Sequence, residues 1–197
     1  MGLQTDFILA SIAGYLLGSI PFGLLLTRAF GAGDVRQIGS GSIGATNVLR
    51  TGRKGLAAAT VLLDAGKGAA AVLLSAMLWP GTEGVAAVAA IVGHCFPLWL
   101  RFKGGKGFAT AAGVLLALAW PVFLICAAIW ALAAVVSRIS SVASLTAVTA
   151  APVAAWLMGR GDLVVTLVAV AVVVYFQHRA NIGRLMRGEE PRVGSKP

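Results

Sequence analysis

The sequence predicts an all-α integral membrane protein, a seven-transmembrane-helix bundle that forms a single domain over residues 1–197. Of the 197 residues, 58% are hydrophobic and 12% are charged, whereas soluble domains have about 45–50% and about 25%. The hydrophobic residues gather in long runs without charges, and one soluble core could not bury them all. This composition excludes a disordered chain, a collagen and a disulfide-stapled scaffold, and it argues against a soluble enzyme.

Hydropathy places the predicted helices at residues 7–26, 56–79, 85–100, 108–119, 122–136, 142–158 and 163–177. Helices are expected because only a helix satisfies its own backbone polar groups within lipid. The strands of a membrane barrel would alternate polar and apolar residues, and residues 85–92 and 164–174 show no such alternation. Several segments, above all the fourth, are shorter than the about 20 residues of an upright helix.

Basic residues fall on alternate connections, which predicts the orientation in the membrane. One set of connections, together with the C-terminal tail, carries Arg28, Arg36, Arg50, Arg53, Lys54, Arg101, Lys103, Lys106, Arg138, Arg179, Arg184, Arg187, Arg192 and Lys196. The opposite side carries one basic residue, Arg160, beside the acidic residues Asp6, Glu83 and Asp162. Since basic connections stay in the cytoplasm, we expect the N-terminus outside, the C-terminus inside and the active site at the cytoplasmic face.

The first polar segment on that face is residues 39–50, with three glycines, two serines, a threonine and an asparagine. Glycines let backbone amides approach an anion closely, and the side chains add further donors. The candidate ligands are Ser40, Gly41, Gly44, Thr46, Asn47 and Arg50. The spacing matches G-x-G-x-x-G, but no buried strand precedes it and Asp64 lies in a predicted helix, so we reject a dinucleotide site. The alternative is a flexible loop.

The second segment consists of residues 93–97 and then residues 102–107, which lead directly into the fourth predicted helix. A glycine turn at a helix start aims amide donors and the positive end of the helix dipole at one point. This predicts a phosphate-binding loop made of Lys103, Gly104, Gly105, Lys106 and Gly107. A Walker loop would need glycine in place of Leu100 and a hydroxyl residue in place of Gly107. The alternative is a basic loop at anionic lipid headgroups, which needs the lysines but not the glycines.

The third segment continues the last predicted helix, where His178 and Asn181 would share a face. Histidine exchanges a proton near neutral pH, so His178 is the candidate general base. The alternative is a histidine that caps the helix or lies at the membrane interface. Ser141 and Ser144 are near the start of the sixth predicted helix, either as helix caps or as hydroxyl ligands.

Asp64 and Lys67 lie three residues apart inside the second predicted helix. Ionisable groups are costly in a bilayer and usually face the bundle interior, so we expect the pair to neutralise itself, with a functional role as the alternative. His94, with glycine and proline around it, is expected to be a structural partner of a turn. No metal site is expected, because the two histidines are far apart and no carboxylate cluster accompanies them, and no cofactor is expected either.

Two anion-binding segments and one proton-exchanging group at a membrane edge suit two phosphorylated substrates, at least one of them lipophilic. At these segments the whole chain resembles the bacterial acyl-phosphate-dependent glycerol-3-phosphate acyltransferases. The resemblance rests on residues 39–50, on Gly93-His94-x-Phe96-Pro97 through residues 103–107 with Ala109-Thr110, and on His178-x-x-Asn181-Ile182 with Arg184-Leu185-x-x-Gly188-x-Glu190. It implies an enzyme of the bacterial inner membrane that acylates the first hydroxyl of glycerol 3-phosphate from an acyl phosphate. The products would be 1-acylglycerol 3-phosphate (lysophosphatidic acid) and phosphate, in the first acylation of phospholipid synthesis.

The resemblance also implies roles for individual residues. Gly104, Gly105 and Gly107 would bind the acyl phosphate, and Glu190 matches a structural glutamate. The residues that would line the glycerol 3-phosphate and reaction site are Ser40, Arg50, Lys106, His178 and Asn181.

Two positions depart from the pattern of this family. Ser42 stands where many relatives have asparagine, which leaves one ligand of the first segment in doubt. Ala143 interrupts the serine cluster, so either Ser141 or Ser144 is the matching ligand, and Ser144 is preferred.

Two other function classes fit parts of the sequence. A transporter of a phosphorylated metabolite would bind near the membrane midplane between internal repeats, whereas here the polar residues crowd one edge and no repeat is visible. A non-catalytic membrane partner would leave the two glycine segments unexplained. The basic face could attract an acidic protein that forms the acyl donor; membrane lipid is the other expected partner, and no nucleic acid is expected.

Overall fold

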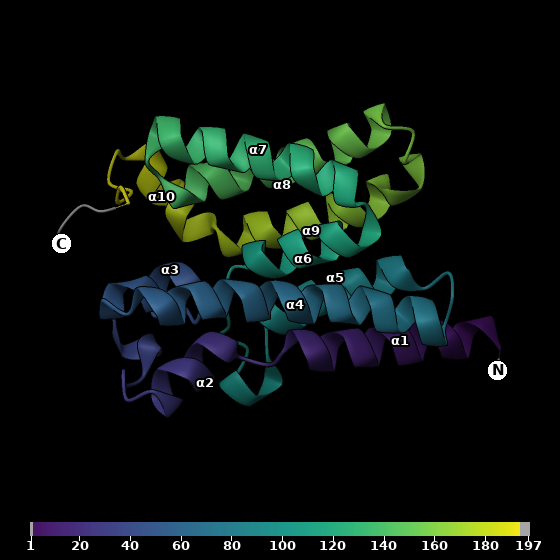
Figure 1. Ribbon diagram of the computed structural model, residues 1–197, viewed down its shortest axis with the longest axis horizontal. Coiled ribbons are helices and arrows are strands. Elements are labelled where there is room, and N and C mark those ends of the chain that lie inside the picture. The colour runs from purple at the N-terminus through teal and green to yellow at the C-terminus, as the bar shows by residue number, and fades with distance from the viewer. Residues whose placement is uncertain (1, 194–197) are drawn as a thin grey trace. The chain divides into compact units, whose positions relative to one another are not determined.

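The computed structural model describes residues 2–193, and these residues form helices and turns without a strand. The chain divides into two compact units, Met1–Leu118 and Ala119–Pro197 (Figure 1). The helical class predicted from composition is therefore confirmed for the described residues. The prediction of one domain over the whole chain stays a prediction, and the two units are described separately below.

The first unit contains the helices α1 (Leu3–Gly18), α2 (Phe22–Ala29), α3 (Ala45–Val48), α4 (Lys54–Leu78), α5 (Glu83–Cys95) and α6 (Phe108–Leu118). Short 3₁₀ turns connect them at Val35–Gln37, Leu49–Thr51 and Leu98–Leu100. Helix α4 packs against α1, α5 and α6, and α1 also packs along α5 (Figure 1). The core of this unit thus consists of α1, α4 and α5, from which the two glycine-rich loops extend.

Small residues allow these helices to approach closely. Gly14 and Gly18, four residues apart on α1, lie against Ala86 and Ala90 of α5, where a Cβ on either glycine would overlap the alanine carbonyl. Such small-residue stripes are typical of helix contacts in membranes, because backbones gain van der Waals contact when side chains do not separate them. The α1–α5 contact therefore fixes the position of the C-terminal end of α5, from which the second glycine-rich loop begins.

The second unit contains α7 (Trp120–Ser137), α8 (Ser140–Leu157), α9 (Val164–Gln177) and α10 (Arg179–Met186), with a 3₁₀ turn at Gly161–Leu163. Helix α8 contacts both α7 and α9. The turn between α7 and α8 places Arg138 at a φ of 58°, and the carbonyl of Arg138 accepts a hydrogen bond from the backbone N–H of Val193 (2.7 Å). This bond ties the C-terminal segment to the start of α8.

Within residues 2–193, length and composition give five segments able to cross a membrane: Leu3–Ala29, Lys54–Leu78, Glu83–Leu100, Trp120–Ser137 and Ser140–Leu157. A sixth is added if α9 and α10 form one bent span, and α6 is apolar but shorter. All seven predicted segments overlap these helices, and the chain is an integral multi-pass membrane protein. The count of seven spans and the orientation stay predictions.

Three details differ from the expected helices. The segment at residues 7–26 is broken, because α1 ends at Gly18 and α2 begins only after Pro21, whose ring cannot continue a helix. The last helix does not continue past Gln177 but bends by 63°. Neither serine caps α8, because the N-cap residue is Ile139, which makes no side-chain cap bond.

Candidate active site

A buried asparagine organises the segment of residues 39–50. Only 2% of Asn47 is exposed, and its Nδ2 donates to the carbonyl oxygens of Val35 (2.7 Å), Ile38 (3.1 Å) and Ser42 (2.8 Å). Buried backbone carbonyls need such donors where no regular helix or strand supplies them. These contacts give Asn47 a role inside the loop, beside the ligand role that the sequence predicts.

The oxygen of the same side chain brings Ser40 and Arg50 together. Asn47 Oδ1 accepts a hydrogen bond from the backbone N–H of Ser40 (3.1 Å) and another from Arg50 Nη1 (3.4 Å). Gly39 has a φ of 53°, and a Cβ there would overlap the Arg50 side chain. Glycine is therefore required at residue 39 both by its backbone conformation and by the space that Arg50 occupies.

The other predicted ligands of this segment lie in the four-residue helix α3 or just before it. Gly44 is its N-cap residue, and the Gly44 N–H donates to Ser42 Oγ (3.3 Å). Gly41 and Thr46 are exposed. Ser42 thus supports the turn into α3, which is the observed role of the position that departs from the family pattern.

The second glycine-rich loop is fastened to the end of α5. The N–H of Gly104 donates to the carbonyl of Cys95 (3.1 Å), and the N–H of Gly105 donates to the carbonyl of His94 (3.0 Å). The expectation that these two amides point at an anion is therefore wrong. The last carbonyls of a helix lack partners within the helix, and residue 97 is a proline without an N–H to offer them. The amides of Gly104 and Gly105 serve as the donors instead.

The lysines and the start of α6 remain as the predicted anion-binding features of this loop. Gly107, with a φ of 83°, directly precedes the first residue of α6, Phe108, so the positive end of that helix faces the loop. Lys106 is half-buried, whereas Lys103 is exposed. With the amides of Gly104 and Gly105 already bonded, the predicted anion contacts that stay compatible with the structure are those of Lys106, Gly107 and the first turn of α6.

A buried charged cluster lies beneath this loop in the first unit. Asp64 Oδ1 is 2.7 Å from Lys67 Nζ and 3.6 Å from His94 Nδ1. Lys67 also donates to the carbonyl of Ile20 (2.7 Å), in the break between α1 and α2. The predicted ion pair of Asp64 with Lys67 is confirmed. His94 lies in the last turn of α5, and its role as a structural partner of the neighbouring turn stays a prediction.

In the second unit, Glu190 joins three side chains. Its Oε1 accepts hydrogen bonds from Ser141 Oγ (2.7 Å) and from Asn181 Nδ2, and its Oε2 accepts one from Arg184 Nε (2.7 Å). Burial opposes ionisation, but these hydrogen bonds outweigh it and hold the pKa of the Glu190 carboxyl below its ordinary value. The contacts support the structural role predicted for Glu190.

His178 marks the bend between α9 and α10. Its Nδ1 lies 2.8 Å from the carbonyl oxygen of Val174, and because a carbonyl can only accept, Nδ1 carries the hydrogen. In the neutral ring the lone pair is then on Nε2, which is the form a general base needs. Only 3% of His178 is exposed.

Asn181 lies in the first turn of α10 and is 5% exposed. Its Oδ1 is buried and has no hydrogen-bond partner among residues 2–193. A buried acceptor without a donor is uncommon in native proteins and often marks a functional position. Ser144 on α8 is also buried, so the second unit supplies a basic nitrogen, an unmatched acceptor and a buried hydroxyl.

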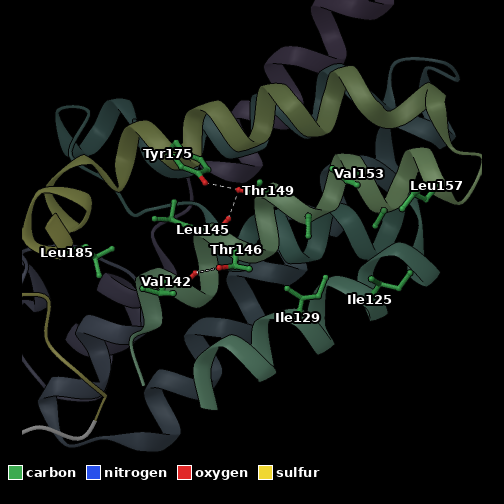
Figure 2. Close-up of a pocket in the computed structure, with 12 residues that line it drawn as sticks. Ile125, Ile129, Val142, Leu145, Thr146, Thr149, Val153, Leu157, Tyr175 and Leu185 are labelled. Carbon is green, nitrogen blue, oxygen red and sulfur yellow. Dashed lines mark hydrogen bonds between the residues drawn. The ribbon is translucent and has the colours of Figure 1, made fainter. Parts of the chain in front are cut away.

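An apolar groove of about 670 Å³ also belongs to the second unit, and Figure 2 shows its lining along α8. The few hydroxyls in it are already bonded: Thr146 donates to the Val142 carbonyl (2.9 Å), and Thr149 shares a hydrogen bond with Tyr175 (2.7 Å) (Figure 2). The remaining lining is aliphatic, so the groove suits a hydrocarbon chain, which acyl donors and membrane lipids both carry.

Comparison with known proteins identifies the family. The family model described as "Glycerol-3-phosphate acyltransferase" matches residues 8–188. The chain belongs to this family. Among curated relatives, the glycerol-3-phosphate acyltransferase of Erythrobacter litoralis is 56% identical over 197 residues and covers all of both chains. That of Mesorhizobium japonicum is 58% identical over 189 residues, which cover 96% of this chain and 97% of the relative.

Two solved structures have the same fold as this acyltransferase. Both are of PlsY (YgiH), described as an integral membrane glycerol 3-phosphate acyltransferase. Its glycerol 3-phosphate form has a TM-score of 0.90 and 33% identity, covering 95% of this chain and 96% of PlsY. The form with lysophosphatidic acid has a TM-score of 0.88 and 32% identity, covering 95% of each chain. Membership of the family favours an enzyme over the transporter and over the non-catalytic partner.

Sequence reasoning missed the contact between Asp64 and His94 and the one between His94 and Gly105. These residues lie on α4, on α5 and in the following loop, and no local spacing connects them. One signal was available, since two adjacent glycines after a proline-terminated helix indicate a close backbone approach. The glycine pair indicated that little space is available at residues 104 and 105, but it did not indicate that His94 fills that space.

Proposed function

We propose that this acyltransferase moves an acyl group from an acyl phosphate to the 1-hydroxyl of glycerol 3-phosphate, giving 1-acylglycerol 3-phosphate and phosphate. The observation that carries the proposal is the likeness, over 95% of the chain, to a membrane acyltransferase crystallised in glycerol 3-phosphate and lysophosphatidic acid forms. The acylation of glycerol 3-phosphate to lysophosphatidic acid follows from the family. The acyl phosphate donor and the assignment to the bacterial inner membrane, as the first acylation of phospholipid synthesis, are the proposed parts.

An acyl phosphate donor requires no covalent nucleophile on the enzyme. It is a mixed anhydride whose phosphate leaves readily, so the enzyme has to position two substrates, neutralise charge and accept one proton. The hydroxyl oxygen forms a bond to the acyl carbon, the bond from that carbon to the phosphate oxygen breaks, and inorganic phosphate leaves. We assign the donor phosphate to Lys106, Gly107 and the start of α6, with Lys103 at the exposed edge of the loop.

The second unit is assigned to the acceptor hydroxyl. Asn181 Oδ1, an acceptor without a donor, is suited to receive the hydrogen bond of the 1-hydroxyl. The lone pair on His178 Nε2 is suited to take its proton, with an oxygen of a substrate phosphate as the alternative destination. Ser141 is already bonded to Glu190, so we assign the ligand role to Ser144 and a supporting role to Ser141.

The first loop is assigned to the phosphate of glycerol 3-phosphate. Arg50 supplies a guanidinium that pairs well with phosphate oxygens, and Ser40 supplies a hydroxyl. Both are exposed and are gathered at Asn47. Gly41, Gly44 and Thr46 complete the proposed ligand set from the same loop.

The proposed orientation places the basic connections in the cytoplasm, across seven spans. It is tested with single cysteines in a background without Cys95 and Cys126, at Glu83 and at Lys103, in intact cells. An impermeant maleimide should label Glu83→Cys and leave Lys103→Cys unlabelled. The reverse pattern would overturn the orientation. A cytoplasmic basic face is also what an acidic donor-forming protein would recognise.

The decisive experiment offers acyl phosphate, acyl-CoA and acyl-carrier protein separately to the purified protein with labelled glycerol 3-phosphate. We expect lysophosphatidic acid from acyl phosphate alone, and its loss in Lys106→Ala, since that lysine neutralises the donor phosphate. Product from acyl-CoA would show that the donor is assigned wrongly. Glycerol 3-phosphate binding without product from any of the three donors would overturn the proposal.

A further inference from the structure

Gly105 is in direct contact with the imidazole ring of His94. A Cβ on Gly105 would overlap His94 Nε2 and would lie 2.8 Å from Cε1 and 3.0 Å from Cδ2. The same two residues are joined through the backbone, because the Gly105 N–H donates to the His94 carbonyl (3.0 Å). Gly105 is buried. The ring of His94 is thus the surface against which the middle of the loop at residues 103–107 packs.

The ring lies next to a buried charged cluster on α4. Asp64 Oδ1 lies 3.6 Å from His94 Nδ1 and 2.7 Å from Lys67 Nζ, and none of the three residues is more than 4% exposed. A buried carboxylate is tolerated only where cations and hydrogen-bond donors surround it. Lys67 in turn donates to the Ile20 carbonyl. The ring, on α5, therefore packs beside an ion pair on α4 that is itself bonded to the break between α1 and α2.

We propose that His94, oriented by Asp64, is a positioning residue for the acyl phosphate loop, and that the imidazole is what requires glycine at residue 105. The inference rests on the proposed function, in which Lys106 and Gly107 hold the donor phosphate. Those two residues directly follow Gly105, so a shift of Gly105 away from the ring displaces them from the start of α6. His94 then acts on the reaction through the loop without touching a substrate.

Gly104 provides a matched contrast within the same loop. A Cβ on Gly104 would overlap the backbone carbonyl of His94 and would lie 2.6 Å from Pro97 Cδ. Replacing the His94 side chain leaves that carbonyl in place. A smaller residue at 94 therefore makes room for a methyl group at residue 105 but not for one at residue 104.

The test is a pair of double-mutant cycles read by steady-state kinetics with acyl phosphate. Gly105→Ala should raise the KM for acyl phosphate more than about tenfold, because the loop is displaced, while the KM for glycerol 3-phosphate stays near wild type. Adding His94→Ala should recover more than about threefold of that loss. The same change should recover nothing in Gly104→Ala. Global destabilisation would not raise the KM for one substrate alone. Nor would His94→Ala then rescue Gly105→Ala while leaving Gly104→Ala unchanged.

Each outcome of these cycles decides the proposal. Equal, additive defects in both cycles would overturn it, because the glycine would then be required by the substrate and not by the ring. If Gly105→Ala does not fold, the melting temperatures in detergent give the same comparison: folding restored by His94→Ala supports the proposal, and folding not restored overturns it. A wild-type protein inactive with acyl phosphate would refute the proposed donor instead, and the melting temperatures would still test the contact.

Discussion

A buried asparagine organises one region in each unit of the molecule. The two asparagines differ in how many of their polar atoms form hydrogen bonds. Asn47, in the first unit, directs the two hydrogens of Nδ2 at three backbone carbonyls and accepts two hydrogen bonds through Oδ1, all within residues 35–50. Asn181, in the second unit, donates to Glu190. Its Oδ1 is buried without a hydrogen-bond partner in the part of the chain that the structure describes.

We interpret Asn47 as a residue that stabilises its loop and Asn181 as a residue whose acceptor is left for a ligand. An amide whose atoms are all bonded contributes stability, whereas an unmatched buried acceptor costs about 1–3 kcal/mol until a donor reaches it. A substrate hydroxyl would supply that donor. We therefore expect changes around Asn181 to affect turnover first and changes at Asn47 to affect stability first.

The largest expected effect is at His178, beside Asn181 in the second unit. In His178→Asn the side-chain amide can still donate to the Val174 carbonyl, but the basic nitrogen is lost. We expect kcat to fall by about 10²–10⁴-fold, with a melting temperature close to wild type. Turnover of acyl phosphate and detergent melting measure the two quantities. Undiminished turnover in the folded variant would remove this histidine from proton transfer.

A matched pair of variants around Glu190 tests the unmatched acceptor. Asn181→Ala and Ser141→Ala each remove one hydrogen bond to Glu190 Oε1, so each should lower stability by about 1 kcal/mol. Only Asn181→Ala also removes Oδ1, so it alone should lower kcat by about 10²-fold. Equal kinetic losses in the two variants would mean that Asn181 acts only by supporting Glu190.

In the first unit, Asn47→Ala should lower the free energy of unfolding by about 2 kcal/mol, because three loop carbonyls lose their donor. Its kcat should change far less than that of Asn181→Ala, while the KM for glycerol 3-phosphate rises as Ser40 and Arg50 lose their shared acceptor. Denaturant unfolding in detergent measures the stability. Gln37→Ala, an exposed position in the preceding 3₁₀ turn Val35–Gln37, is the control. If Asn47→Ala were as stable as wild type but lost turnover, Asn47 would act in the reaction and not in the stability of the loop, contrary to our expectation.

The smallest expected effect is a dependence of stability on pH through Glu190. Its pKa in the folded protein is lower than the ordinary value of 4.5, so the unfolded chain binds more protons at this group and folding gains stability as the pH rises. That contribution is fully present above about pH 4.5 and is lost as the pH falls through the folded-state pKa. The stability difference between wild type and Glu190→Gln should therefore shrink on acidification. A constant difference would show that the charge of Glu190 contributes nothing.

How much could be predicted from the sequence depended on whether a feature is local. The pair Asp64 and Lys67 could be predicted because three residues along a helix make neighbours. The break before Pro21 could have been predicted from the proline, but the hydropathy of residues 7–26 concealed it. The amides of Gly104 and Gly105 were misassigned, because their partners are carbonyls at the end of a different element, α5.

The sequence by itself determined the helical membrane class, the candidate residues of all three polar segments and the resemblance to the family, because apolar runs, charge asymmetry and motifs are properties of short stretches of chain. Only the tertiary structure decided which polar atoms are already satisfied. In the folded chain the polar atoms of Asn47 are all hydrogen-bonded, whereas Asn181 Oδ1 has no hydrogen-bond partner among the described residues. Ser141 donates to Glu190, and the ring of His94 packs against Gly105. The physical reason is that these hydrogen bonds and close contacts join atoms from different elements of the fold. Spacing along the sequence does not predict which of those atoms come together.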